Sequence, residues 1–296
     1  MTGVGEASRP FFSLVVPTVG RSAEVREMLR SAVGSSVQDF ELIIVDQNAD
    51  DRLREVCAEY AARIPLQRMQ VSFKGAARAR NYGARFATGE VINFPDDDCE
   101  LSTRLLEDAQ RLFESNCYKV VIGMTVDRQG HASTASFRRD QRVLSEWSMW
   151  GRNVECTMFF RRNVFLASDG FDERFGVGSD FGSDEGAELL IRLLKKLAPG
   201  EVFYTDRLAF YHPQKGTGCS PDDLRRAFSY ARGTGALFAK WPTASVTYHC
   251  ARLLVRAAAA ALICVGQRRR FYLERLRGFV DGYRDFVRRT RAGAER

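Results

Sequence analysis

Residues 89–101 read GEVINFPDDDCEL, an apolar run that passes directly into three consecutive aspartates. The short, β-branched part of this run predicts a buried strand over 91–94. Carboxylates this close raise one another's pKa, so an acidic strand end is costly unless a cation neutralises it. Oxygen ligands of this kind suit Mg²⁺ or Mn²⁺ together with substrate phosphates. The alternative is a solvated acidic turn, or a cap by Asp97 or Asp98 on a helix expected over 101–113.

Similar apolar runs flank this stretch and alternate with segments of helical spacing. Strands are expected at 11–17, 41–45, 68–73 and 119–125, and helices at 22–33, 53–60, 76–87 and 102–114. Alternation of this kind predicts βαβ units and therefore an α/β fold with a mostly parallel, doubly wound sheet.

Polar residues fall where three of these strands end. Thr18 follows the first strand, Asp46 follows the second, and Asp96 to Asp98 follow the fourth. Ligands bind beyond the carboxyl ends of strands in such sheets, so these positions predict one binding site.

The second half of the chain is less regular. A strand is expected at 154–160, a helix at 184–197, short strands at 202–204 and 208–211, and helices from 221 onward. The hydrophobic content of 45% over 296 residues is ample for a buried core.

Cysteine usage and the N-terminal sequence predict a cytoplasmic protein. The seven cysteines are scattered without a CxxC pair, which argues against a disulfide framework and against a zinc ribbon. Residues 1–9 contain no apolar run, so no secretory signal is expected there.

Five stretches, in register, carry a resemblance to a known family. They are FSLVVPTVGR (12–21), FELIIVDQN (40–48), GAARARNYGARFATGEVINFPDDDCEL (75–101), ASDGFDERFG (167–176) and SDEGAELLIRLLKK (183–196). Over roughly residues 10–215 the chain resembles the inverting GT-A glycosyltransferases of family 2. The resemblance implies a Rossmann-like GT-A domain with a nucleotide-sugar half, 10–125, and an acceptor half, 126–215. A basic helical extension, 216–296, would follow.

The resemblance assigns roles in binding the donor nucleobase. Pro17 and Thr18 would line the base pocket, and Asp46 would hydrogen-bond the base. The family usually has a second acidic residue next, where this chain has Gln47. The identity of the donor nucleobase is therefore not fixed: a UDP-sugar is favoured, with a dTDP- or GDP-sugar as alternatives.

Further roles concern the diphosphate and the metal. Arg78 and Asn81 would contact the base and the diphosphate region. Asp96 and Asp98 match the DxD signature, so Asp96 would hold the ribose and Asp98 the Mn²⁺ or Mg²⁺ ion. Asp97 is the variable middle residue of this signature; it would contact the nucleotide or else support the residues that do. His212 matches a metal-side or phosphate-side histidine of some members, although a lone histidine is more often structural.

The catalytic base is expected at the start of the helix over 184–197. Family members often carry an acidic residue where this chain has Gly186, so the base must be a neighbour. Glu185 is the first choice and Asp184 the second. Glu188 would bind the acceptor or support the helix, and Trp150 would stack on an acceptor ring or belong to the core.

The resemblance implies a hexosyl or related transferase that inverts the anomeric centre. Its acceptor would be a hydroxyl of a glycan or lipid-linked molecule, in bacterial cell-surface polysaccharide synthesis. One alternative is a catalytically inactive nucleotide-binding or membrane-associated scaffold, because Gly186 has no side chain. Another is a sugar nucleotidyltransferase, but PTVGRS (17–22) has one glycine where that class needs a glycine-rich loop.

Positive charge is concentrated at the end of the chain. Residues 249–296 contain 12 Arg and 4 acidic residues, whereas the formal net charge of the whole chain is +7. The uncharged run 257–266 is shorter than the roughly 20 residues that a membrane span needs. Apolar residues at helical spacing, Phe271, Leu276, Phe279 and Tyr283, predict helices that rest on an anionic membrane at the inner face, or else pack against the catalytic domain or a second subunit. No nucleic-acid partner is expected, and the sequence leaves the oligomeric state open.

Overall fold

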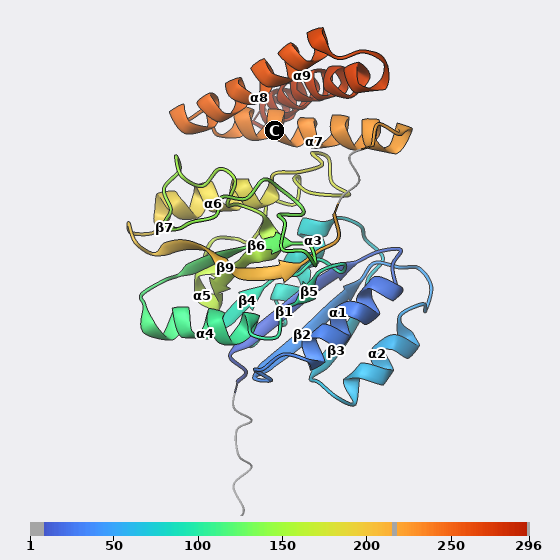
Figure 1. Cartoon of the computed structure of the whole chain (residues 1–296), viewed down its shortest axis with the longest axis vertical. Helices are drawn as coiled ribbons and strands as arrows, with labels where there is room; N and C mark the ends of the chain where they lie inside the picture. Colours follow the sequence, from blue (N-terminus) through green and yellow to red (C-terminus); the bar gives the residue numbers. More distant parts are fainter. Residues whose placement is uncertain (1–8, 215–217, 295–296) are drawn as a thin grey trace, which may run out of the picture. The chain divides into compact units, whose positions relative to one another are not determined.

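The computed structural model describes residues 9–214 and 218–294 of the chain. The predicted domain boundary at 215/216 lies outside the described residues, as does nearly all of the N-terminal stretch in which no secretory signal is expected. Within these limits the fold class predicted from the sequence is confirmed: one large sheet, with helices in the connections and at the C-terminal end (Figure 1).

The N-terminal half of the sheet is parallel. It contains β1 (Phe12–Thr18), β2 (Phe40–Asp46), β3 (Leu66–Gln70) and β4 (Val91–Asn93). Strands β1 and β2 pair in register from Phe12↔Phe40 to Thr18↔Asp46, so their polar C-terminal residues lie side by side. Their connections hold α1 (Ala23–Val33), α2 (Arg54–Ala61) and α3 (Ala76–Ala84). Every residue of β1 is buried, as expected for a parallel strand covered on both faces.

The other half of the sheet is mixed. It contains β5 (Glu100–Leu101), β6 (Val120–Val126), β7 (Gln141–Val143), β8 (Met158–Arg161) and β9 (Val202–Tyr211). The strand order is β3-β2-β1-β4-β8-β6-β9-β5, with β7 paired to β9. Strand β8 is antiparallel to both β4 and β6.

Two sequence predictions differ from this half of the sheet. The two short strands expected at 202–204 and 208–211 form one strand, β9, whose pairing with β6 shifts register between Ile122 and Met124. A Cβ on Gly123 at that shift would lie 2.3 Å from the Leu208 carbonyl oxygen, so only glycine fits there. Helix α4 (Leu105–Ser115) begins later than expected, with Arg104 at its N-cap. The capping interpretation of Asp97 and Asp98 is therefore wrong.

The described residues form two compact units. The first comprises 9–73, 79–170 and 192–214, and it contains the whole sheet together with α5 (Arg162–Ala167). The second comprises 74–78, 171–191 and 218–294. Helix α6 (Glu185–Lys196) begins in the second unit and ends in the first. The domain boundaries named from the sequence stay a prediction.

Three long helices dominate the second unit, α7 (Pro221–Lys240), α8 (Ala244–Ile263) and α9 (Gly266–Ala294), which lie side by side (Figure 1). A capping box starts α7: the Ser220 hydroxyl accepts from the Asp223 N–H, and the Asp223 carboxylate accepts from the Ser220 N–H. Glycines let α7 and α9 approach closely, because a Cβ on Gly282 would lie 2.1 Å from the Arg232 carbonyl oxygen.

Candidate functional site

The end of β1 is tied to the acidic residues after β4. The Thr18 hydroxyl donates to Asp97 Oδ2 at 2.7 Å. Arg21 NH1 lies 2.5 Å from Asp97 Oδ1 and 2.8 Å from Asp98 Oδ2. Burial raises the pKa of Asp97 to about 6, although Arg21 and Thr18 act to lower it. Asp97 thus acts within the protein as a link between two strand ends, and Arg21 is a cation of the site that the sequence prediction missed.

A group of four side chains could hold a metal ion. The ligand atoms of Asp96, Asp98, Cys99 and His212 all lie within 4.8 Å of one another. His212 Nδ1 lies 2.6 Å from the Pro213 carbonyl oxygen, which can only accept, so Nδ1 carries a proton and Nε2 is left to ligate. Nε2 lies 3.2 Å from Asp98 Oδ1. A cation between these two atoms would satisfy both of them.

The donor set of this group fits the expected ion. Carboxylate oxygens and a neutral imidazole suit Mn²⁺ and, for the oxygens, Mg²⁺. Cys99 is fully buried, and although its hydrogen bond with Cys156 acts in the opposite direction, burial raises the pKa of its thiol. A protonated thiol is a poor ligand. Asp96, Asp98 and His212 therefore form the ligand set that would hold the ion.

The arginine that contacts this group is Arg80. It is 2% exposed, and its NH2 lies 2.7 Å from Asp96 Oδ1 and 3.6 Å from Glu155 Oε1. Arg78, the arginine expected to reach the nucleotide, belongs to the second unit, where its Nε lies 3.8 Å from Glu173. Residues two positions apart point to different sides of a helix, so only one of the pair can contact Asp96.

We expect the Arg80→Met variant to bind nucleotide about 10- to 100-fold more weakly in the presence of Mn²⁺, because Asp96 loses the partner that orients it. Calorimetric titration of the nucleotide with and without Mn²⁺ measures this effect. The exposed Arg85, near the end of α3, provides the matched control Arg85→Met. Equal losses in both variants would contradict the orienting role of Arg80.

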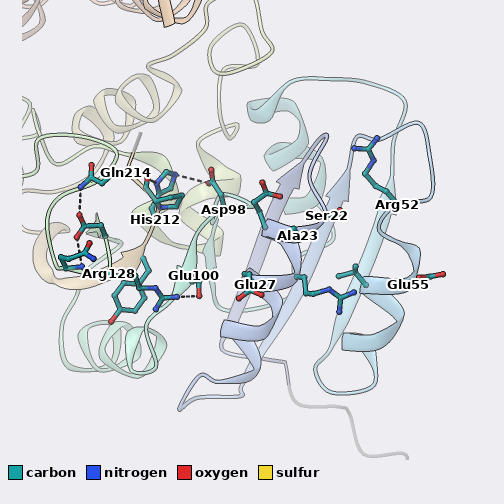
Figure 2. A pocket seen from close by; sticks show the side chains of 17 residues that line it. Ser22, Ala23, Glu27, Arg52, Glu55, Asp98, Glu100, Arg128, His212 and Gln214 are labelled. Atoms are coloured by element: carbon teal, nitrogen blue, oxygen red, sulfur yellow. Dashed lines mark hydrogen bonds and ion pairs between the residues drawn. The ribbon is translucent and has the colours of Figure 1, made fainter. Parts of the chain in front are cut away.

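A cavity of about 990 Å³ opens beside the metal-binding group (Figure 2). Asp98 and His212 line one part of it, and the N-terminal turn of α1 lines another. Charges of both signs line its walls: Arg26, Arg52 and Arg128 lie among acidic residues, and each of the three pairs with a carboxylate, that of Glu59, Asp50 and Glu100 respectively. The volume is at the upper end of ordinary ligand pockets and suits a nucleotide sugar.

Other predicted donor residues lie deeper in the fold. Asp46 is fully buried, where Oδ1 accepts from the backbone and side chain of Asn48 and Oδ2 accepts from Arg68 Nε at 2.8 Å. A direct contact between Asp46 and a base would require Arg68 to move. Pro17 is buried within β1. Asn81 packs against Gly170, where a Cβ would lie 2.4 Å from its Oδ1.

The candidate bases lie at the start of α6, in the second unit. Asp184 is partly exposed and has a φ of 70°, a left-handed conformation that is strained for a residue other than glycine. Its Oδ2 accepts hydrogen bonds from the hydroxyls of Ser183, at 2.8 Å, and Thr234, at 2.9 Å. Glu185 is 3% exposed, with its carboxylate against Gly176. Burial therefore favours Asp184 over Glu185, the reverse of the order expected from the sequence.

The two residues expected to bind the acceptor differ in exposure. Glu188 is fully buried, and its Oε1 lies 2.6 Å from Lys240 Nζ and 3.3 Å from Trp241 Nε1. These contacts favour the helix-supporting interpretation of Glu188. Trp150 is partly exposed in the turn that follows β7.

We expect Lys240→Met to lower the free energy of unfolding by about 3 kcal/mol, because it removes the cation that compensates the buried Glu188. Lys240 also pairs with Asp172 at 2.7 Å. Burial would raise the pKa of Asp172, but hydrogen bonds from Arg174 and Lys240 outweigh it and hold that pKa well below its usual range. A carboxylate with a lowered pKa stabilises the fold above the unfolded pKa and loses this contribution as pH falls.

The difference between this variant and the wild type should therefore shrink below about pH 4. Urea unfolding at neutral and acidic pH measures both effects. Lys196→Met, at an exposed position of α6, is the control. A loss of stability as large in the control, or a difference that grows in acid, would contradict the assignment.

The parallel N-terminal half, the acidic end of β4 and the mixed second half together form the GT-A fold. Residues 13–171 match the family model described as Glycosyl transferase family 2. The chain belongs to this family.

Curated relatives match parts of the chain. The minor teichoic acid biosynthesis protein GgaB of Bacillus subtilis is 25% identical over 179 residues, which cover 57% of this chain and 20% of that protein. An uncharacterized glycosyltransferase of Haemophilus influenzae is 34% identical over 104 residues, 35% of each chain. The chain thus aligns with about a fifth to a third of the length of these relatives.

Solved structures share the fold over nearly the whole chain. Staphylococcus aureus TarS in complex with UDP-GlcNAc superposes with a TM-score of 0.59 at 15% identity, covering 95% of this chain and 92% of that one. A mannosyltransferase from Pyrobaculum calidifontis, in complex with GDP-Man and Mn²⁺, gives the same TM-score and identity, covering 95% and 88%.

Proposed function

We propose that this glycosyltransferase is metal-dependent and transfers a sugar, with inversion, from a nucleotide-diphosphate sugar to an acceptor hydroxyl. The observation that carries the proposal is the convergence of Asp96, Asp98 and the oriented His212 at the edge of a 990 Å³ cavity. An acidic group facing an imidazole in a cavity of nucleotide-sugar size is suited to hold a cation and a diphosphate together.

On the donor side, Asp98 and His212 would hold Mn²⁺ or Mg²⁺, with Asp96 beside them. When bound, the ion offsets the negative charge that develops on the leaving nucleotide diphosphate. Arg21, held by Asp97 and Asp98, supplies a second positive group at the same place. A UDP-sugar is the favoured donor, and dTDP- and GDP-sugars are the alternatives, since the related folds were solved with UDP-GlcNAc and with GDP-Man.

On the acceptor side, Asp184 would accept the proton of the attacking hydroxyl. The hydroxyls of Ser183 and Thr234 both donate to its Oδ2 and so fix the orientation of the carboxylate, as a positioned base requires. The acceptor oxygen forms the new bond to the anomeric carbon while the bond to the diphosphate oxygen breaks. A single in-line displacement of this kind converts an α-linked donor into a β-linked product.

The names of two relatives support the proposed acceptor class. GgaB is named for minor teichoic acid biosynthesis, and TarS is a poly(ribitol-phosphate) β-N-acetylglucosaminyltransferase. By analogy, we propose a glycan or lipid-linked acceptor in bacterial cell-surface polysaccharide synthesis, with the enzyme in the cytoplasm at the inner face of the membrane. The scaffold alternative keeps some support because Gly186 replaces the family's acidic residue.

A donor screen tests the proposal. The full chain is titrated calorimetrically with UDP-, dTDP- and GDP-sugars, with and without Mn²⁺, and turnover is then followed with the donor that binds. We expect metal-dependent binding of one nucleotide and a β-linked product by NMR. Binding without turnover on any glycan or lipid-linked acceptor would favour the scaffold, and an α-linked product from an α-linked donor would exclude inversion.

A further inference from the structure

Two of the four apolar residues of α9 that the sequence assigns to a membrane, Phe279 and the 41% exposed Tyr283, contact α7. The Phe238 ring of α7 lies 6.0 Å from the Phe279 ring and 5.8 Å from the Tyr283 ring. A Cβ on Gly278 of α9 would lie 2.3 Å from the Phe228 carbonyl oxygen, so the two backbones nearly touch. This face of α9 is therefore largely occupied by α7, another helix of the same unit, and a larger exposed apolar surface lies elsewhere on these helices.

That surface lies on α8 and on the loop that joins it to α9. One face of α8 is buried and includes Val246, Cys250, Ala257 and Ala261. The other face is exposed at Tyr248 (61%) and Val255 (68%), one heptad apart. It continues at the C-terminal end of α8 with Leu262 (84%) and Ile263 (81%), and in the two-residue loop with Val265 (83%). Large aliphatic side chains this exposed, and adjacent, mark an interaction surface.

Exposed arginines lie near the apolar C-terminal end of α8 and the loop that follows it. Arg256 lies on the last turns of α8, and Arg268, Arg269 and Arg270 begin α9; all four are exposed. In the part of the chain that the structure describes, none of these guanidinium groups forms an ion pair with a carboxylate. Arg268 also lines a groove of about 450 Å³ between α7 and α9, together with Arg226 and Arg275. The apolar residues at the end of α8, flanked by these unpaired arginines, complement a surface that is apolar inside and anionic outside.

We propose that the outer face of α8, its C-terminal residues Leu262 and Ile263, and the loop 264–265 dock on an anionic lipid bilayer. Leu262, Ile263 and Val265 would insert below the headgroups, while Arg268–Arg270 meet lipid phosphates. A second copy of the chain is a poorer occupant, because a twofold contact through this patch would bring like-charged arginines together. The proposal is independent of the donor site and of the transfer reaction.

A membrane span is the competing arrangement. By length and composition alone, helix α8 is long and apolar enough to cross a membrane. Of its most apolar 18 residues, 22% are buried within the protein. The uncharged run 257–266 by itself is too short to span, so a span would have to include the charged part of α8. A span would place Arg252 and Arg256 within the hydrocarbon, which is costly, whereas a helix lying at the interface keeps them near the headgroups.

The test is co-sedimentation of the full chain with phosphatidylcholine vesicles that contain or lack phosphatidylglycerol. We expect binding only with phosphatidylglycerol, release by high salt or alkaline carbonate, and a loss of roughly tenfold or more in the double variant Leu262→Asp, Ile263→Asp. Each Arg→Gln change at 268–270 should weaken binding about fivefold. These positions are exposed, so nucleotide binding and the melting temperature should not change.

Two matched controls accompany these variants. Val143→Asp places the same charge at an exposed valine of β7, and Arg284→Gln removes an exposed arginine farther along α9. Both should bind vesicles like the wild type. The proposal fails if the double variant binds as well as the controls, or if the protein resists carbonate, as a span would. It also fails if the wild type self-associates without binding vesicles and the double variant is monomeric.

Discussion

The Asp98→Ala variant is expected to lose Mn²⁺-dependent nucleotide binding and to transfer sugar about 10³-fold more slowly than the wild type. Asp98 is central to the candidate metal group, because Oδ1 faces His212 Nε2 at 3.2 Å and the residue also lines the cavity. Its removal leaves Asp96 and His212 as ligands, too few to hold an exchangeable divalent ion against water. The charge that develops on the leaving diphosphate would then lack the metal ion, with Arg21 still in place.

Three measurements separate this effect from a damaged fold. Calorimetry with and without Mn²⁺ gives the metal dependence of nucleotide binding, the initial rate gives transfer, and the melting temperature shows whether Mn²⁺ with nucleotide still stabilises the protein. Asp98→Asn keeps the shape of the side chain and should show nearly the same loss. Glu100→Gln is the matched control, since Glu100 lines the same cavity but pairs with Arg128. Wild-type metal dependence in Asp98→Ala would place the ion elsewhere.

The inner strands of the parallel half were predictable because they are buried, whereas the edge strand β3 has no fully buried residue and lies at 66–70 rather than at the expected 68–73. Strands β1 and β2 appear in the sequence as uninterrupted apolar runs, and their last residues, Thr18 and Asp46, pair in register as the βαβ pattern implies. Where strands are short or antiparallel the pattern weakens. Strand β7 is exposed at all three residues, and no apolar run marks it.

The sequence predicted the chemistry of the site, but it predicted less well which side chains contact the acidic residues. The DxD signature indicated a metal, yet the approach of His212 to Asp98 depends on how β9 pairs in the sheet, which local sequence does not specify. The importance of Arg80 could have been predicted from its position on α3, although the family motif pointed to Arg78. Arg80 shares a helical face with the buried Ala77 and Ala84, and an arginine on a buried face needs a charged partner.

The sequence pattern also could not predict which apolar faces of the C-terminal helices are exposed. The stripe of α9 and the outer face of α8 are both apolar, and periodicity alone cannot tell which of them is covered by a neighbouring helix. Glycines along α9 decide it, because Gly278 and Gly282 allow α7 to lie against that side.

The Asp184→Asn variant is expected to reduce kcat by about 10²- to 10⁴-fold while leaving donor binding unchanged, because it removes only the proton acceptor. Asp184 is partly exposed, its backbone is held at a φ of 70°, and two hydroxyls fix one of its oxygens. Strain at a non-glycine residue persists where the surrounding structure holds it, and such residues cluster at functional positions. Glu185→Gln should instead act mainly on stability, since the carboxylate of Glu185 is 3% exposed and packs against Gly176.

The two variants are compared through kcat and KM separately, through the dependence of kcat/KM on pH, and through calorimetric donor binding. Loss of a base should remove the acidic limb of the wild-type pH profile in Asp184→Asn and leave it in Glu185→Gln. Asp180→Asn, at an exposed acid that pairs with Arg289, is the control for a nearby change of charge. If Glu185→Gln loses the acidic limb and Asp184→Asn keeps it, the order expected from the sequence is right after all. If both keep it while the donor still binds, the proton leaves by another group, and the replacement of the family's acidic residue by Gly186 becomes the feature to explain.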